Sequence, residues 1–327
     1  MNRRSFNAFL GLGLPLGLLS AAPGVRAQGW PDRPVRLVLS QPAGSGPDNV
    51  ARILSDHLTK GWGQAVVIEN RPGGQNTIGA QAAARSPADG HSFYFATTAA
   101  LVTNRFLFKQ LPYDPVKDFT PVAFVGRSPF GILVAAQSPV RTLDDLIARS
   151  RAEPGKLALG NEGPRTFSGM IARLLNARAD MKANLVSYAS VGVSMQDLIG
   201  GHVDAVVGDL ASSAQLIRQG RLRLLATTSA ERIPGWENVP ALAERLPGFE
   251  MVGWFAVVAP AGTPPAAVAR FSADLRKLLA ERDVAERIAT IGPIADPGMD
   301  AEQLGSFLRA EHSRWAQITR EIGVLPE

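Results

Sequence analysis

The sequence has no cysteine, only four histidines and, beyond its first 27 residues, no apolar run of membrane-spanning length. The absence of cysteine excludes disulfide frameworks, thiol catalysis, cysteine-ligated zinc and iron–sulfur clusters. The histidines stand far apart in the chain, at positions 57, 91, 202 and 312, so a histidine-rich metal site is not expected. We therefore expect neither a metal ion nor a cofactor.

Several catalytic and nucleotide-binding motifs are also missing. The sequence has no Gly-x-x-x-x-Gly-Lys-Ser/Thr phosphate loop, no His-Glu-x-x-His helix and no calcium loop. Gly44-Ser-Gly46 begins like a dinucleotide fingerprint, but Asn49 occupies the place of its third glycine. The stretch at 192–196 lacks the closing glycine of a nucleophile elbow. An exported α/β hydrolase remains only a weak alternative, with little support beyond the carboxylates Asp48, Glu162 and Asp209.

The first 27 residues have the features of a secretory signal peptide. Arg3 and Arg4 precede an apolar run at 6–22, and Val25-Arg-Ala27 is a small-x-small cleavage pattern. We expect removal of residues 1–27 and a periplasmic mature protein. The Arg-Arg-Ser-Phe start also fits a twin-arginine signal, so the sequence leaves the export route open between that and general secretion.

Removing this segment nearly balances the charge. The full chain has 34 basic and 29 acidic residues, and the segment takes three arginines and no acid, which leaves 31 against 29. No cluster of basic residues with interleaved aromatics occurs, so nucleic acid is not an expected partner.

The remaining chain alternates short β-rich runs with amphipathic stretches, which favours the α/β class with parallel strands covered by helices. Strands are predicted at 35–39, 65–68, 93–95, 122–125, 131–134, 157–159, 185–188, 203–207, 222–226 and 251–259. Helices are predicted at 48–60, 77–85, 142–152, 167–177 and 193–199, with a helical tail from 260 to 323. No Ser/Gly linker separates the two α/β units, so we expect strands crossing between them as a hinge.

Four strand-to-helix junctions carry small, glycine-rich or hydroxyl-rich sequence, at 41–48, 163–168, 190–194 and 209–213. In open parallel sheets, ligands bind beyond the carboxyl ends of the strands, where helix N-termini gather. Exposed N–H groups and the helix dipole make such ends anion sites without a cationic side chain. The junctions therefore predict a binding site for a small anion.

The same residues have structural alternatives, which the sequence leaves open. Asp48 and Asp209 are good N-cap residues, and Thr166 or Ser168 fits the start of the next helix. Arg165 is either a solvated loop cation or a bidentate partner of a carboxylate. We also expect Asp48 to face the cleft in which the small anion would bind.

Longer stretches resemble one family, the periplasmic substrate-binding proteins of tripartite tricarboxylate transporters, known as Bug or TctC. The stretches that carry the resemblance are residues 30–38, 67–74, 86–90, 111–125, 197–204, 228–232, 247–250 and 259–264, with Trp254. The resemblance implies a two-domain Venus-flytrap fold with crossing hinge strands. The first domain would comprise residues 30–127 plus 254–327, and the second residues 128–253.

The resemblance also implies a function. It implies a monomeric receptor that traps a small carboxylate between its domains, uses no cofactor and delivers the solute to the subunits of a membrane permease. A receptor that presents the solute to a sensor kinase stays open as an alternative. The predicted ligand-binding residues are Ala43, Gly44, Ser45, Gly46, Asp48, Arg165, Thr166, Ser168, Ser190, Val191, Gly192 and Asp209.

The loops depart from the family pattern where the ligand would bind. The usual Pro-Gly-Gly before the first loop's aspartate is replaced by residues 42–47, and Pro47 has no N–H to donate. The usual Gly-Ser-x-x-His loop is replaced by residues 163–168, and Tyr188-Ala-Ser190 lacks the lysine of Tyr-Lys-Gly. The identity of the ligand therefore cannot be inferred from the resemblance.

Overall fold

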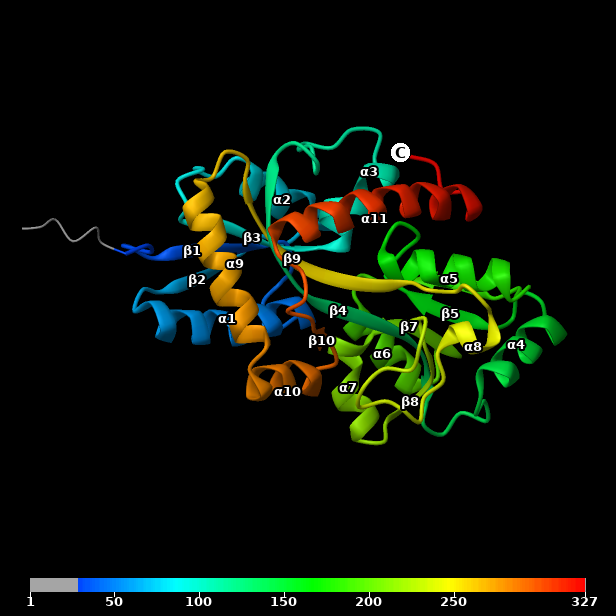
Figure 1. Ribbon diagram of the computed structural model, residues 1–327. Coiled ribbons are helices and arrows are strands. Elements are labelled where there is room, and N and C mark those ends of the chain that lie inside the picture. The colour runs from blue at the N-terminus through cyan, green and yellow to red at the C-terminus, as the bar shows by residue number, and fades with distance from the viewer. Residues whose placement is uncertain (1–28, 327) are drawn as a thin grey trace, which may run out of the picture.

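A computed structural model describes residues 29–326 of the chain, and the predicted signal segment at 1–27 lies outside them. One strand, β4 (Phe119–Ala135), runs through both halves of the molecule and joins their sheets (Figure 1). The strand order is β2-β1-β3-β9-β4-β7-β5-β6, with β8 and β10 also paired to β4. The chain therefore has the predicted α/β class, with two halves joined by a crossing strand.

The first half is built on a parallel sheet that β9 completes in the opposite direction. β1 pairs in parallel with both β2 and β3, and β3 pairs antiparallel with β9. Its elements are β1 (Val35–Leu39), α1 (Gly46–Trp62), β2 (Val66–Asn70), η1 (Gly74–Asn76), α2 (Thr77–Ala84), β3 (Ser92–Thr97), η2 (Ala99–Thr103), α3 (Asn104–Leu107) and β9 (Val252–Pro260).

The second half repeats the parallel arrangement on a smaller sheet. β5 pairs in parallel with β6 and β7, and both β7 and β8 pair antiparallel with β4. Its elements are α4 (Leu143–Ala152), β5 (Ala158–Asn161), α5 (Phe167–Arg178), β6 (Asn184–Ser187), α6 (Val191–Gly200), β7 (Ala205–Asp209), α7 (Leu210–Arg218), β8 (Leu222–Thr227) and α8 (Leu242–Arg245).

The crossing strand corrects one detail of the sequence prediction. Two strands were expected at 122–125 and 131–134, whereas β4 is continuous and pairs first with β9 along Phe119–Pro129 and then with β7 and β8. The strand continues through Gly126, Pro129 and Gly131. Its register shifts against β9 at 121–123 and 124–126, and against β8 at 132–133, without ending the strand.

The C-terminal segment is less uniformly helical than predicted. Between α9 (Pro265–Leu279), α10 (Arg282–Thr290) and α11 (Ala301–Glu321) lies the short strand β10 (Ile294–Ala295), which pairs with β4. α11 crosses from the first half to the second (Figure 1). Its Glu311 accepts a hydrogen bond from Trp254 of β9, and its Glu321 pairs with Arg178 of α5. Trp254 therefore belongs to the packing of the crossover region.

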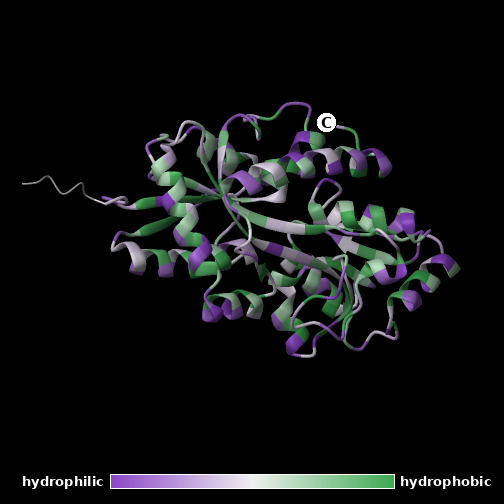
Figure 2. Cartoon of the chain, viewed as in Figure 1, coloured by the Kyte–Doolittle hydropathy of each residue, from purple (hydrophilic) through white to green (hydrophobic). Residues whose placement is uncertain are grey.

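The alternation of side chains in the first sheet explains its two covering layers. Phe93 and Phe95 of β3 pack on the side of α1 and α9, whereas Tyr94 belongs to the core on the side of α2 and α11. A third cluster, which includes Val206 of β7, Val191 of α6 and Leu210 of α7, closes the second half. In Figure 2 the strands are mostly apolar, whereas polar colour gathers on the outer turns of the helices.

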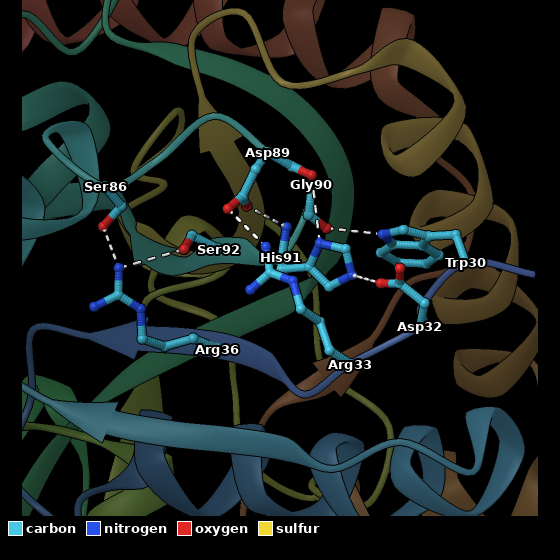
Figure 3. A network of polar contacts seen from close by, with 9 residues as sticks. All are labelled: Trp30, Asp32, Arg33, Arg36, Ser86, Asp89, Gly90, His91 and Ser92. Carbon is cyan, nitrogen blue, oxygen red and sulfur yellow. Dashed lines mark hydrogen bonds and ion pairs between the residues drawn. The ribbon is translucent and has the colours of Figure 1, made fainter. Parts of the chain in front are cut away.

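The segment that leads into β1 is fixed by a polar network (Figure 3). The Trp30 indole N–H donates to the carbonyl of Gly90, and Arg33 pairs with Asp89 at 2.8 Å. His91 Nε2 lies 2.9 Å from Asp32 Oδ1. These residues sit at the start of β1 and β3, at the opposite end of the strands from the predicted ligand loops. Among residues 29–326, no helix is long and apolar enough to cross a membrane.

Candidate functional site

The N-termini of α1 and α7, from different halves of the molecule, meet at the predicted ligand loops. A Cβ atom on Gly46, the first residue of α1, would lie 2.5 Å from Ala211 Cβ and 3.3 Å from Asp209 Oδ1. Such contacts are shorter than side chains allow, so the approach of the two helices requires glycine at position 46. The 41–48 loop and the Asp209 loop therefore lie directly against each other, and we refer to them as parts of a first and a second wall.

A second glycine permits the same approach from the side of α10. Gly292 has a φ of +105°, and a Cβ there would lie 2.6 Å from the backbone carbon of Leu210. The segment that follows α10 in the first half is thus packed directly against the first turn of α7. Closure of the walls depends on the absence of side chains at two separate glycines.

The first wall contains Asp48, whose position differs from the predicted N-cap. The N-cap of α1 is Ser45, and Asp48 lies in the first turn with no exposed surface. Its oxygens accept hydrogen bonds from the Gly44 N–H at 2.8 Å, the Arg52 guanidinium at 2.8 and 3.1 Å, and Asn70 Nδ2 at 2.9 Å. The Asp48 carboxylate is therefore satisfied within its own half.

These contacts set the charge of Asp48. Burial by itself would raise its pKa, but the hydrogen bonds from Arg52, Asn70 and Gly44 outweigh burial and hold the pKa below its usual value. Asp48 is thus ionised at neutral pH. Ala43 and Gly44 are exposed, and Ser45 donates to the carbonyl of Pro42.

The loop between β5 and α5 forms the first part of the second wall. Thr166 is the N-cap of α5, since its hydroxyl accepts the N–H of Gly169 at 3.1 Å. Ser168 is fully buried and accepts the N–H of Glu162 at 3.0 Å. Arg165 lies half-buried in the same loop. Capping by Thr166 is thus confirmed, and a ligand contact for these residues stays a prediction.

The starts of α6 and α7 complete the second wall. Ser190 caps α6 by accepting the N–H of Val193 at 3.4 Å, and Gly192 is exposed one residue into the helix. Asp209 caps α7, as predicted, by accepting the N–H of Ser212 at 2.8 Å. Burial raises the pKa of Asp209, while its hydrogen bonds to the first turn of α7 oppose that shift.

Glu162 is the residue that sequence reasoning noticed but did not include in the site. It follows β5 directly, and its carboxyl group interacts with the N–H of Val191 and lies 3.4 Å from Ser168 Oγ. Burial and, to a smaller extent, the negative charge of Asp209 together raise the pKa of Glu162 to about 7, against the opposing effects of Val191 and Ser168. The available sequence signal for Glu162 as a site residue was its position: it is an acidic residue at the end of a strand, among three helix N-termini.

The structure places the predicted residues on two walls that touch where Gly46 meets Ala211. The first wall is the 41–48 loop, and the second comprises the starts of α5, α6 and α7. Helix N-termini on both sides supply partial positive charge, which suits an anion. Arg52 and Asn70, which were not predicted, belong to the first wall through Asp48. Among residues 29–326, no three potential His, Asp or Glu ligands are grouped in a way that could hold a metal ion.

Comparison with known proteins shows which family and which solved structures this chain is similar to. The family model described as "Tripartite tricarboxylate transporter family receptor" matches residues 50–324. The structure titled R. palustris Rpa4515 with adipate is similar with a TM-score of 0.85 and 31% identity, over 91% of this chain and 100% of that one. The periplasmic binding protein BugD has a TM-score of 0.82 and 28% identity, over 91% and 100%. MatC from Rhodopseudomonas palustris with bound malate has a TM-score of 0.78 and 28% identity, over 88% and 99%.

Proposed function

Since the chain belongs to the tripartite tricarboxylate transporter receptor family, we propose that it is a receptor for a small carboxylate solute. The solute lies between the two walls, the walls close on it, and no bond is made or broken. The protein acts in the periplasm as a monomer and delivers the solute to the subunits of a membrane permease.

One observation carries this proposal: strand-end loops from both halves converge at the contact of Gly46 with Ala211. The backbone N–H groups and helix dipoles of these loops suit a carboxylate. A dipole contributes about 0.3–1 kcal/mol, and each hydrogen bond to a charged oxygen about 1.5–3 kcal/mol. A few such bonds from two walls suffice for micromolar affinity, which requires about 8 kcal/mol.

Two relatives support a carboxylate as the solute. Two similar structures hold adipate and malate, both of which carry two carboxylate groups. A solute with two carboxylates has one group for each wall, so we propose a small dicarboxylate or a close analogue as the solute of this receptor.

The organisation of the chain supports hinged closure. We propose residues 30–127 plus 254–327 as one domain and residues 128–253 as the other, with β4 and β9 crossing between them. Bending of these two strands near their crossover would separate Gly46 from Ala211 and admit the solute. The contacts of α11 with both halves lie on the same route.

A thermal-shift screen of the mature protein against di- and tricarboxylates, aromatic acids and acidic amino acids tests the function. A solute at 100 times its dissociation constant stabilises the folded protein by about 2.7 kcal/mol, which gives a clear shift of the melting temperature. A stabilising carboxylate that the protein leaves chemically unchanged is the expected result. Release of a product from the bound solute would instead indicate an enzyme.

Arg165 provides a test of the second wall. If Arg165 binds a solute carboxylate through two hydrogen bonds, Arg165→Ala weakens binding by about 2 kcal/mol, roughly 30-fold. A change below about 0.5 kcal/mol would remove Arg165 from the site. Calorimetric titration with the carboxylate found in the screen measures the difference.

A further inference from the structure

The second wall of the proposed site contains two carboxyl groups, Glu162 and Asp209, where a carboxylate solute is expected to bind. We propose that Glu162 determines which solutes bind, because it binds them as a neutral acid and donates its carboxyl O–H to a solute carboxylate oxygen. The inference rests on the proposed function. It assigns to that site a preference for carboxylates that have no positive charge of their own.

Glu162 lies in the second wall, directly after β5. Its backbone N–H donates to Ser168 Oγ at 3.0 Å, and Ser168 Oγ donates to its carboxyl group at 3.4 Å. The N–H of Val191 at the start of α6 and the charge of Asp209 at the start of α7 act on the same carboxyl group. Asp209 Oδ1 in turn lies next to Gly46 of the first wall, so Asp209 connects Glu162 with the contact between the walls.

Charge balance then requires a proton. An ionised Glu162 uses the Val191 N–H, one of the donors expected to bind the solute, and adds its charge to that of Asp209. A solute carboxylate entering between them would make a third negative group in a partly buried space, which is strongly unfavourable. Protonation of Glu162 removes one charge and supplies an O–H donor, so the same residue changes from a competitor of the solute to a partner.

The proton is available at low cost near neutral pH. The pKa of Glu162 is raised to about 7, first by burial and then by the charge of Asp209, against the opposing effects of Val191 and Ser168. A bound carboxylate raises this pKa further. Binding above pH 7 therefore takes up a proton from solvent, and the affinity falls as the pH rises through the pKa of the free protein.

The consequence for selectivity follows from the same balance. A solute with an ammonium group can place that group against ionised Glu162 and Asp209, so it needs no proton. A solute with carboxylates only depends on protonated Glu162. We therefore expect adipate and malate to bind with proton uptake.

Calorimetric titration of the mature protein with adipate and malate, in buffers of different ionisation enthalpy between pH 6.5 and 8.5, tests the inference. Simple carboxylates stay ionised throughout this range. With a free pKa near 7, uptake of roughly 0.9 proton per solute is expected at pH 8, and roughly 20-fold weaker binding at pH 8.5 than at pH 6.5. Glu162→Gln keeps a side-chain donor and cannot ionise, so it should bind with no proton uptake and lose the pH dependence.

Two further variants identify the source of the effect. Asp209→Asn keeps the cap of α7 but removes the charge next to Glu162, so the weakening should begin at lower pH. Glu302→Gln, at an exposed position of α11, should behave like the wild-type protein. Binding of adipate or malate with a flat pH profile and no proton uptake would overturn the inference alone. Absence of binding of any carboxylate at every pH would overturn the proposed function, and the inference with it.

Discussion

The two walls each carry an acidic residue at a strand-to-helix junction, yet the environments of these residues are opposite. Asp48 is fully buried and surrounded by donors, including the guanidinium of Arg52, and its pKa is lowered. Glu162 lies next to Asp209, and its pKa is raised to about 7. The number of donors and the nearest charge, rather than burial by itself, decide whether each carboxyl group is ionised.

This difference suggests a division of labour between the walls. Asp48 fixes the first loop through Gly44 and the end of β2 through Asn70, so the first wall is rigid before a solute arrives. The second wall can change its charge by one proton. The first wall is already ordered, so little conformational entropy is lost there when a solute binds, which favours affinity. The second wall distinguishes solutes by their charge, because its own charge changes with one proton.

The largest effect is expected when the first wall loses its internal ion pair. Asp48→Ala removes the acceptor of Arg52, Asn70 and the Gly44 N–H, and should lower the free energy of unfolding by about 3–4 kcal/mol at pH 7. Because the pKa of Asp48 is lowered, its contribution is present above pH ~4 and is lost as the pH falls through the folded-state pKa. Urea denaturation measures the change.

A matched pair serves as the control for Asp48. Arg282 and Glu286 have the same four-residue spacing in α10, at 2.6 Å, but both are exposed. Glu286→Ala should change the free energy of unfolding by less than about 0.5 kcal/mol. If both variants lose equally little stability, Asp48 does not organise the first wall.

The next effect concerns the contact between the walls. Gly46→Val places a side chain where a Cβ would lie 2.5 Å from Ala211 Cβ, so the walls can no longer meet. We expect solute affinity to fall on the order of 100-fold, about 2.7 kcal/mol, because the closed state becomes rare. Gly61→Ala is the control in the same helix, since a Cβ at Gly61 meets no atom within 4 Å. Wild-type affinity in Gly46→Val would show that the solute does not require contact of the walls.

A smaller effect is expected from Glu162 in the solute-free protein. Its folded-state pKa is raised from 4.5 to about 7, so ionising Glu162 destabilises the fold progressively across that window. The full shift corresponds to about 3 kcal/mol, and partial exposure reduces it to about 2 kcal/mol. Glu162→Gln should therefore be more stable than the wild-type protein at pH 8 and equal to it at pH 4, below the unfolded-state pKa. Equal stability at both pH values would contradict the assigned charge state.

The smallest effect separates the capping role of Asp209 from its charge. Asp209→Ala removes the acceptor of the Ser212 N–H and should lower the free energy of unfolding by about 1 kcal/mol, whereas Asp209→Asn should change it by only a few tenths. Thermal unfolding at pH 7 compares the two variants. A loss for Asn as large as that for Ala would show that charge, rather than capping, holds α7.

The fold was largely predictable because its signals are local. The strand predicted at 35–39 matches β1, and each parallel strand predicted in the second half overlaps an observed one. The continuity of β4 was not predictable, since Gly126 and Pro129 discourage a strand locally and pairing with distant strands, β9 and β10 at this point, sustains it. The strand β10 was also missed, because a strand of two residues shows no periodic pattern in the sequence.

The site was predictable in position but less so in detail. Glycine-rich loops after strands located the walls, and the caps Thr166 and Asp209 followed from residue type and place. The role of Asp48 did not, because its partner Asn70 comes from the end of another strand. The raised pKa of Glu162 likewise depends on Asp209, 47 positions away in the chain, which only the folded structure brings near.

Closure of the two walls on a carboxylate is the central claim, and the distance between the halves tests it most directly. The chain has no cysteine, so Lys60→Cys on α1 and Gln219→Cys after α7, both at exposed positions, permit specific spin labelling of each half. Pulsed electron paramagnetic resonance then measures the distance distribution with and without the carboxylate identified by thermal shift. We predict a broad, longer distribution without solute and a single shorter distance, matching the closed walls, at saturation. An unchanged distribution at saturating solute would contradict closure.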